Sequence, residues 1–74
     1  MECRVRIRYL REDHDLSQKQ VGEILHIGQR TYSDYELGNT RIPLESLITL
    51  AKYYDVDMNY ISGVSNKKRR FPVD

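Results

Sequence analysis

Apolar residues recur every three or four positions along most of this 74-residue chain, which is the spacing of α-helices that bury one face. Val21 and Leu25 are four residues apart, so they share one face of a helix. Tyr32 and Tyr35 are three residues apart and share one face of the next helix. Gly22 has no side chain and allows a close crossing. The pattern predicts two short helices packed at a steep angle across a tight turn, a helix-turn-helix.

Residues that favour helix ends support this division of the chain. Ser17 and Gln20 have the spacing of a capping box, in which each side chain bonds a free backbone amide at the start of a helix. Glycine is favoured directly after a helix, which is the position of Gly38. We therefore expect a first helix from its cap Ser17 to near Leu25, a turn containing His26, and a second helix from its cap Gly28 to about Leu37.

Three further helices are expected around this pair, over about Glu2–Asp13, Pro43–Tyr54 and Met58–Ser62. The first has an apolar stripe of Cys3, Ile7 and Leu10, with Arg4, Arg6 and Arg8 largely off that stripe. The helix over residues 43–54 has a broader apolar face, made of Leu44, Leu47, Ile48, Ala51 and Tyr54. No segment alternates like a strand. The predicted fold is therefore all-α, with five helices in one compact domain over residues 1–63.

Charges are distributed unevenly along the chain. Residues 1–63 contain eight Lys and Arg against ten Asp and Glu, a net −2. Residues 64–74 contain Lys67, Lys68, Arg69 and Arg70 against Asp74, a net +3. The folded part is therefore not a general binder of polyanions, and DNA binding would need a few local polar and positive groups. Residues 64–74 lack periodicity, so we expect a disordered basic tail, with a solubilising role favoured over an arm that reaches phosphate.

Size and composition limit the classes of protein that this chain can form. Its 74 residues allow one small domain without a deep active-site cavity. There is no apolar run of the length needed to span a membrane and no apolar core of a signal peptide near the N-terminus. The single cysteine, Cys3, excludes an intramolecular disulfide and is typical of a reducing compartment. We therefore expect a cytoplasmic protein.

The helix-turn-helix and the helices around it together resemble the lambda-repressor/Cro-like DNA-binding domains, the XRE family. The resemblance covers Val5 to Gly63 and rests on the following motifs: Ile7-x-x-Leu10-Arg11, Leu16-Ser17-Gln18, Val21-x-x-x-Leu25-x-Ile27, Tyr32-x-x-Tyr35-Glu36-x-Gly38, and Leu47-x-x-Leu50-Ala51 followed by Val56. The combination is specific, although each motif alone is weak. It implies a five-helix lambda-repressor-like fold in which the helix after the turn enters the major groove of DNA.

The resemblance also implies roles for individual residues. Base contacts fall to the groove-facing side of the helix after the turn, with Gln29, Arg30, Thr31, Ser33 and Asp34. Phosphate contacts fall to the start of the preceding helix and to the loop that follows, with Gln18, Lys19, Asn39, Thr40 and Arg41. Arg11 and Glu36 match a structural ion pair between the first and third helices. His26 stands where the family usually has glycine, so we expect a positive φ there.

Metal binding and catalysis receive little support from the sequence. His14, His26 and Cys3 lack the spacing of a zinc site, so we expect no metal and no cofactor. Ser17, His14 and Asp15 contain the residue types of a hydrolytic triad, but they sit at a helix cap without a nucleophile elbow. We therefore expect no enzymatic activity.

The function that the resemblance implies is transcriptional regulation, and we expect a repressor. A homodimer would bind an operator in double-stranded DNA, with its two reading helices about 34 Å apart. The candidates for the contact between the two copies are apolar or aromatic residues near the C-terminal end of the domain: Tyr53, Tyr60, Ile61 and Val64. Tyr53, Tyr54 and Tyr60 could instead stack on bases, but burial in the core and a dimer contact are favoured.

One alternative function remains open at this point. A domain of the same fold can act as a protein-interaction module, either antitoxin-like or as the partner of an anti-repressor, with little DNA binding of its own. The net charge of −2 over residues 1–63 supports it. Asp34 supports it too, because a carboxylate on the groove-facing side repels phosphate unless it accepts a hydrogen bond from cytosine N4.

Overall fold

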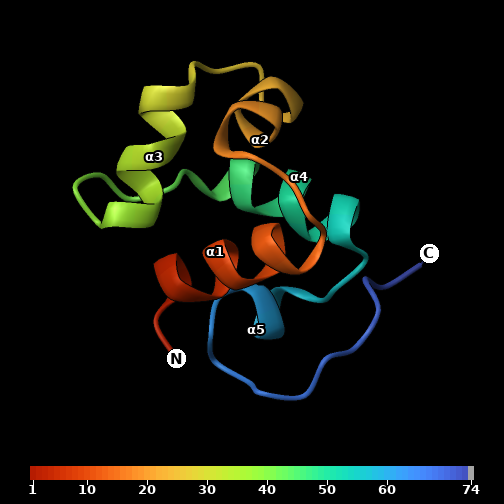
Figure 1. Cartoon of the computed structure of the whole chain (residues 1–74). Coiled ribbons are helices and arrows are strands. Elements are labelled where there is room, and N and C mark those ends of the chain that lie inside the picture. Colours follow the sequence, from red (N-terminus) through yellow and green to blue (C-terminus); the bar gives the residue numbers. More distant parts are fainter. Residues whose placement is uncertain (74) are drawn as a thin grey trace.

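The computed structural model describes residues 1–73, in which five helices and no strand are formed (Figure 1). The helices are α1 (Cys3–Asp13), α2 (Gln18–Ile24), α3 (Gln29–Leu37), α4 (Leu44–Tyr54) and α5 (Met58–Ile61). The predicted all-α, five-helix fold is therefore confirmed, and each helix begins and ends close to where it was expected. Asp74, the last residue of the predicted tail, lies outside the described residues.

The helix-turn-helix formed by α2 and α3 has the caps that the sequence predicts. Ser17 Oγ accepts from the backbone amide of Gln20 at 3.0 Å, and Gln20 Oε1 accepts from the amide of Ser17 at 2.8 Å. In the turn, His26 has a φ of 59°, the positive value expected there. Gly38 follows α3 with a φ of 80°. These local features determine where the two helices begin and end.

Gly22 allows the turn to fold directly onto α2. A Cβ atom at this position would lie 3.0 Å from the carbonyl oxygen of Ile27. The amide of Ile27 also donates to the carbonyl oxygen of Gly22 at 2.9 Å. The close approach expected at Gly22 is therefore made by the backbone of the turn rather than by a crossing helix. The reason is that α2 has only seven residues, so the chain folds back over its last turn.

A single hydrophobic core receives side chains from all five helices. Its buried residues are Ile7, Leu10, Val21, Tyr32, Tyr35, Leu47, Leu50, Ala51, Tyr54, Val56, Tyr60 and Ile61. Leu44 does not belong to this core, contrary to the prediction, because it is 63% exposed. The buried side of α4 is centred on Leu47, Leu50 and Tyr54, and Leu44 lies at the edge of that side where the helix begins.

The predicted dimer contact is wrong in two of its four residues. Tyr60 is 8% exposed and Ile61 is fully buried, because both fill the core where α5 packs against α1 and α4. Tyr53 and Val64 are exposed. Tyr54 is buried, so the three tyrosines of α4 and α5 do not form an open stacking platform.

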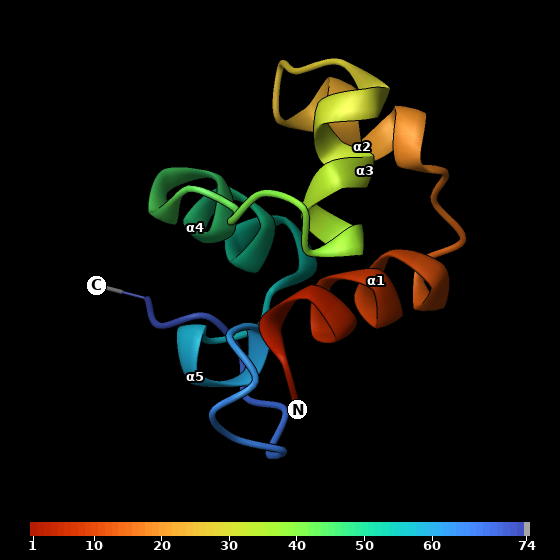
Figure 2. The same ribbon diagram turned by 90° about the vertical axis from the view of Figure 1, so that its left-hand side faces the viewer.

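Arg6, which was expected largely off the apolar stripe of α1, is only 2% exposed. Its guanidinium donates to the carbonyl oxygen of Tyr60 at 2.6 Å, to that of Ser65 at 3.1 Å and to Asn66 Oδ1 at 2.9 Å. Helix α5 and the chain after it lie on one side of α1 (Figure 2), and the hydrogen bonds of Arg6 place its guanidinium on that side. The buried side of α1 is therefore wider than its apolar residues indicate.

The segment after α5 returns along the molecule to the end of α4 (Figures 1 and 2). The carbonyl oxygen of Arg69 accepts from the amide of Asp57 at 2.8 Å. Arg70 Nε donates to Asp55 Oδ2 at 2.7 Å, and the amide of Phe71 donates to Asp55 Oδ1 at 3.2 Å. The Phe71 side chain packs against the core. These contacts connect the basic segment to both ends of the loop between α4 and α5.

Candidate nucleic-acid interface

Helix α3 lies at one end of the molecule, with one side against the core and the other facing outward (Figure 1). Tyr32 is fully buried and Tyr35 is 7% exposed, with their rings edge to face and 6.3 Å between centroids. Glu36, one residue further on, is 6% exposed. These three residues form the inner side of α3 and hold its opposite side toward solvent.

The residues expected to contact bases lie on or beside that outward side. Gln29, Arg30 and Thr31 are exposed, and Ser33 and Asp34 are half-buried. The long donors of Gln29 and Arg30 are therefore free to extend from the first turn of α3, which is the part of a recognition helix that reaches base edges. Gln pairs with adenine and Arg with guanine in the major groove.

Asp34 makes a contact that the sequence pattern does not indicate. Its Oδ1 accepts from Asn39 Nδ2 at 3.4 Å, and its carbonyl oxygen accepts from the amides of Asn39 and Thr40 at 3.0 Å and 3.4 Å. Asp34 therefore holds the loop between α3 and α4 close to the end of α3. The expected phosphate-contacting residues of that loop, Asn39, Thr40 and Arg41, are all exposed.

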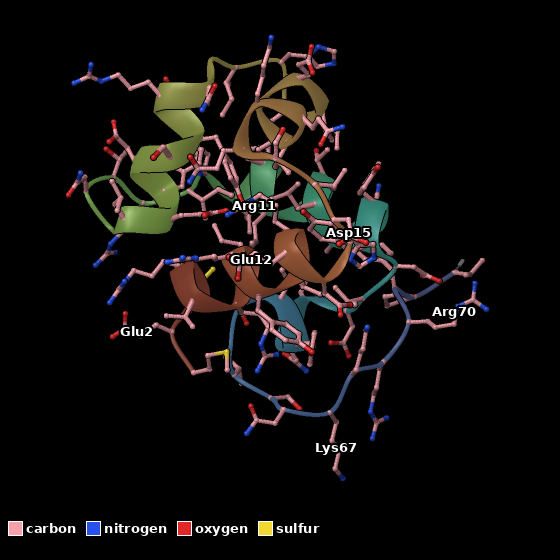
Figure 3. The ribbon with its side chains drawn as sticks, viewed as in Figure 1. Glu2, Arg11, Glu12, Asp15, Lys67 and Arg70 are labelled. Atoms are coloured by element: carbon pink, nitrogen blue, oxygen red, sulfur yellow. The ribbon has the colours of Figure 1, made fainter. Side chains whose placement is uncertain are left out.

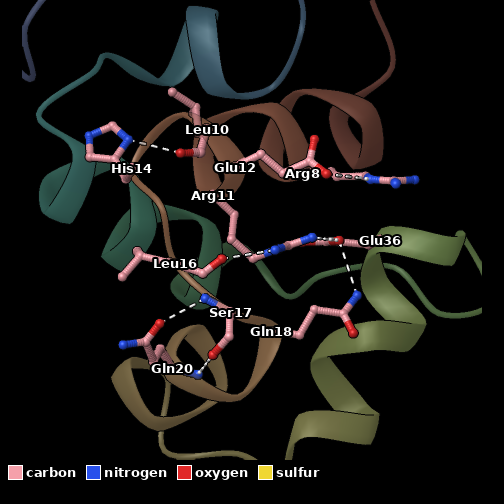
Figure 4. A network of polar contacts seen from close by, with 10 residues as sticks. All are labelled: Arg8, Leu10, Arg11, Glu12, His14, Leu16, Ser17, Gln18, Gln20 and Glu36. Atoms are coloured by element: carbon pink, nitrogen blue, oxygen red, sulfur yellow. Dashed lines mark hydrogen bonds and ion pairs between the residues drawn. The ribbon is translucent and has the colours of Figure 1, made fainter.

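The second expected group of phosphate contacts lies at the start of α2. Lys19 is exposed, and Gln18 is half-buried. Gln18 Nε2 donates to Glu36 Oε1 at 3.2 Å (Figure 4). The amide of Gln18 is therefore oriented by α3, and one proton of its Nε2 is already used within the protein.

Arg11 and Glu36, the pair expected from the resemblance, are brought together between α1 and α3. Arg11 Nε donates to Glu36 Oε2 at 2.7 Å and Nη2 donates to Glu36 Oε1 at 3.1 Å, a bidentate geometry (Figure 4). The two side chains are 12% and 3% exposed. A further bond from Arg11 Nη1 to the carbonyl oxygen of Leu16, at 2.9 Å, joins the chain segment that enters α2. Glu36 thus connects α1, α2 and α3 through Arg11 and Gln18.

The two charges of this pair shift each other's pKa. Burial alone would raise the pKa of the Glu36 carboxyl, but the hydrogen bonds from Arg11 and Gln18 outweigh it and hold the pKa below its usual value. The hydrogen bond to Glu36 raises the pKa of Arg11. Both groups are therefore charged at neutral pH, and the folded state favours their charged forms.

An open hollow of about 570 Å³ lies beside the loop between α3 and α4. The start of α1 forms one wall of this hollow, and Thr40 and Arg41 form part of another. A Cβ atom on Gly38 would lie 2.9 Å from Cδ of Arg4, a flexible side chain, so glycine is favoured here by its positive φ of 80°. Arg4 is thereby placed beside the expected phosphate-contacting loop, although it is far from that loop in the sequence.

The side chains considered for other chemistry have structural partners. Ser17 Oγ is used in the capping box, and His14 Nδ1 lies 2.8 Å from the carbonyl oxygen of Leu10. No three His, Cys, Asp or Glu side chains within residues 1–73 come close enough together to hold a metal ion. No helix of the described residues is long and apolar enough to cross a membrane.

Comparison with known proteins connects this geometry to a family. A family model described as "Helix-turn-helix" matches residues 7–61. The HTH-type transcriptional regulator YobD of Bacillus subtilis (strain 168) is 38% identical over 66 residues, which are 89% of this chain and 58% of YobD. The cryptic phage CTXphi transcriptional repressor RstR of Vibrio cholerae is 41% identical over 51 residues, 69% of this chain and 46% of RstR.

A solved structure has the same fold. The crystal structure of a transcriptional regulator from Listeria innocua superimposes with a TM-score of 0.81 at 27% identity, over 89% of this chain and 62% of that chain. The present chain thus spans 46% to 62% of the length of these three proteins. Because the family model covers most of the chain and includes all of α2 and α3, this chain belongs to the helix-turn-helix family.

Proposed function

We infer that this chain is a sequence-specific DNA-binding transcriptional regulator, acting as a repressor, that reads the major groove with α3. The observation that carries this proposal is the division of α3 into two sides. Tyr32, Tyr35 and Glu36 are buried, while Gln29 and Arg30 extend into solvent from the first turn. A helix held in this way can enter a groove without unfolding any part of the core.

The proposed contacts divide into two kinds. Base edges would be read by Gln29, Arg30, Thr31, Ser33 and Asp34, with Asp34 limited to a cytosine N4 donor because it is a carboxylate. Phosphates would be bound by Gln18, Lys19, Asn39, Thr40 and Arg41. Base contacts determine which sequence is bound, whereas phosphate contacts determine how the domain lies on the duplex.

A homodimer is part of the proposal, because one domain covers only about one half-site and two linked domains bind far more tightly than one. Tyr53 and Val64 are the exposed candidates for the contact between copies. A cytoplasmic location follows from the function, since the operator must be accessible to the protein. The names of the relatives and of the structural neighbour support the transcriptional-regulator part of the proposal.

A protein-interaction module is the second candidate, supported by the net charge of −2 over residues 1–63. A salt series separates the two. Wild-type protein and Arg41→Ala are titrated against a duplex of mixed sequence at several salt concentrations, with Lys52→Ala as a control that removes an equal charge from α4. For a DNA binder, affinity falls steeply as salt rises, and Arg41→Ala lowers the salt slope by about one while Lys52→Ala leaves it unchanged. Absence of binding at every salt concentration would favour the interaction module.

A further inference from the structure

Arg4 belongs to α1, but its side chain lies across the start of the loop between α3 and α4. A Cβ atom on Gly38 would lie 2.9 Å from Arg4 Cδ and 3.3 Å from Arg4 Nε. Gly38 directly precedes Asn39, Thr40 and Arg41, the part of the loop for which phosphate contacts are proposed. The side chain of Arg4 is 46% exposed, so it lies at the surface beside that loop.

The guanidinium of Arg4 has most of its donors free. Within residues 1–73, its one hydrogen bond runs from Nε to Glu2 Oε2, at 2.6 Å. An arginine side chain carries five N–H donors, so both terminal nitrogens of Arg4 can still bind an anion. The side chain of Glu2 is 68% exposed, and water weakens a pair at such a site, so a phosphate can compete with the carboxylate.

Arg4 also borders the open hollow beside the loop, together with Thr40 and Arg41. Two guanidinium groups and a hydroxyl group, from elements far apart in the sequence, therefore border the same space. Guanidinium groups bind phosphate through two parallel hydrogen bonds, and hydroxyl groups donate to it as well. This combination of donors favours an anion with several oxygen atoms.

The positive charge of Arg4 matters because the domain has few such charges to offer. Residues 1–63 contain eight Lys and Arg and have a net charge of −2. Two of the eight, Arg6 and Arg11, are engaged by partners within the protein. Attraction to DNA therefore depends on a few exposed cations near α3 and its loop, and Arg4 is one of them.

We propose that Arg4 binds a phosphate of the DNA backbone, either the one that Arg41 binds or its neighbour on the same strand, and that Glu2 weakens this contact. The inference rests on the proposed function, because it requires the loop after α3 to lie along the backbone. The terminal nitrogens of Arg4 bind the phosphate, while the Glu2 carboxylate beside them repels it. Because a phosphate contact carries no sequence information, Arg4 contributes equally to every sequence.

A salt series with Arg4→Gln, on a selected and a scrambled duplex, tests the phosphate contact. The variant should bind both duplexes more weakly by the same factor and should lower the salt slope by about one. A slope difference of about 0.9 narrows the gap between wild type and variant roughly 3.5-fold as salt rises from about 50 to about 200 mM. Lys52→Gln removes an equal charge from α4 and should leave the slope unchanged. Equal unfolding midpoints of Arg4→Gln and wild type would exclude a loss of fold.

A second experiment locates the contact on the duplex. The phosphates are replaced one at a time by uncharged methylphosphonate, and each duplex is titrated with wild type, Arg4→Gln and Arg41→Ala. At one phosphate, the replacement should weaken wild type but not Arg4→Gln. The same phosphate, or its neighbour on that strand, should be the one at which Arg41→Ala is insensitive.

The role of Glu2 is tested by a double-mutant cycle. Glu2→Gln should strengthen binding to both duplexes, because it removes a charge that repels the phosphate. The gain should be smaller when Glu2→Gln is combined with Arg4→Gln, since the phosphate is then no longer held beside Glu2. An equal gain with and without Arg4→Gln would overturn the role of Glu2.

The proposal for Arg4 is overturned if Arg4→Gln keeps the wild-type slope, or changes it no more than Lys52→Gln does. It is also overturned if no methylphosphonate position distinguishes Arg4→Gln from wild type. If Arg41→Ala still lowers the slope in these cases, the proposed function stands and only the contact of Arg4 fails. If Arg41→Ala and Arg30→Ala leave DNA binding unchanged as well, the proposed function itself fails.

Discussion

Two arginines of α1, the buried Arg6 and the half-buried Arg11, are five residues apart, and the protein stabilises their charges in different ways. Arg11 faces the helix-turn-helix and forms a bidentate pair with the Glu36 carboxylate. Arg6 faces α5 and donates to the carbonyl oxygens of Tyr60 and Ser65, with its guanidinium 3.9 Å from the centroid of the Tyr60 ring. Figure 3 shows Arg11 inside the molecule between α1 and the helix-turn-helix.

We call the contacts around Arg11 and around Arg6 two junctions. The difference between them predicts how the stability of the protein responds to a substitution at each one. At Arg11, two opposite charges compensate each other in the interior, so removing either one leaves the other buried and unpaired. At Arg6, the hydrogen-bond partners are neutral carbonyl and amide oxygens and a sulfur atom, at 3.2 Å from Nε. Removing Arg6 therefore leaves neutral acceptors unpaired, which costs less than leaving a buried charge unpaired. The contact that holds α3 to α1 is therefore the one that depends on charge.

The largest effect is expected from Arg11→Ala. This change strands the Glu36 carboxylate, which is 3% exposed, at a cost of roughly 3–5 kcal/mol in the free energy of unfolding. In denaturant unfolding, this loss should appear as a large drop in the denaturant concentration at the midpoint of the transition. The double variant Arg11→Met with Glu36→Leu removes both charges and should recover most of the loss. A midpoint of Arg11→Ala within error of wild type would refute the charge-based account of this junction.

Arg6→Met should have a smaller effect, about 1–3 kcal/mol, because it removes charge-assisted hydrogen bonds without stranding an opposite charge. Hydrogen exchange adds a local test, since the amides of Ser65 and Asp57 are bonded within this region and should exchange faster in the variant. Arg8→Met is the control, because Arg8 is 62% exposed and forms only a surface pair with Glu12. DNA affinity of Arg6→Met should equal that of wild type at temperatures where both are folded. A loss as large as that of Arg11→Ala would remove the distinction between the two junctions.

Glu36 should make the stability of the protein depend on pH in the acid range. The pKa of Glu36 is held below its usual value in the folded state, so the folded state binds fewer protons than the unfolded state in the acid range. Its contribution to stability is therefore complete above the unfolded pKa of about 4.3 and is lost as the pH falls through the lower folded-state pKa. The free energy of unfolding, measured from pH 7 to pH 2, should fall less steeply with falling pH in Glu36→Gln than in wild type. In Arg6→Met it should fall as steeply as in wild type. Equal slopes in all three proteins would contradict this assignment.

The smallest effect is expected in the basic segment after α5. Lys67 and Arg70 point away from the body of the molecule (Figure 3), and the pair of Arg70 with Asp55 is exposed. The hydrogen bond from Arg70 lowers the pKa of Asp55, but water screens a pair this exposed. Asp55→Asn should leave the unfolding midpoint unchanged within error. The sequence predicts that Lys67 to Arg70 are mobile, whereas the contacts of Arg69 and Arg70 with the loop between α4 and α5 oppose such motion. Rigid backbone order parameters for these residues would contradict the prediction.

The helix-turn-helix could be predicted from the sequence because its signals are local. Ser17, Gln20, His26 and Gly38 act within a few residues of the helix ends that they determine. The outward side of α3 follows in the same way from its period. The Arg11–Glu36 pair could be expected only from the family resemblance, since nothing in the spacing joins residues 25 apart.

The burial of Arg6 could not be predicted in this way. Its partners lie 54 to 60 residues further along the chain, in a segment without periodicity. The same limit applies within the candidate site. The bond of Gln18 to Glu36 depends on how α2 packs on α3, and the bond of Asp34 to Asn39 depends on the path of the loop after α3. The sequence therefore predicts candidate contact residues, but not which of them already form hydrogen bonds within the protein.

The central claim is that α3 reads DNA, and Arg30→Ala tests it most directly. Wild-type protein and Arg30→Ala are titrated against a duplex selected from random DNA and against its scrambled form at one salt concentration. Arg41→Ala serves as the comparison for the loss of an equal charge. The account predicts that Arg30→Ala loses roughly 1–3 kcal/mol of binding free energy on the selected duplex and relaxes preference at one base pair, while Arg41→Ala weakens both duplexes about equally. Unchanged affinity and unchanged preference in Arg30→Ala would contradict the claim and favour a protein-interaction module.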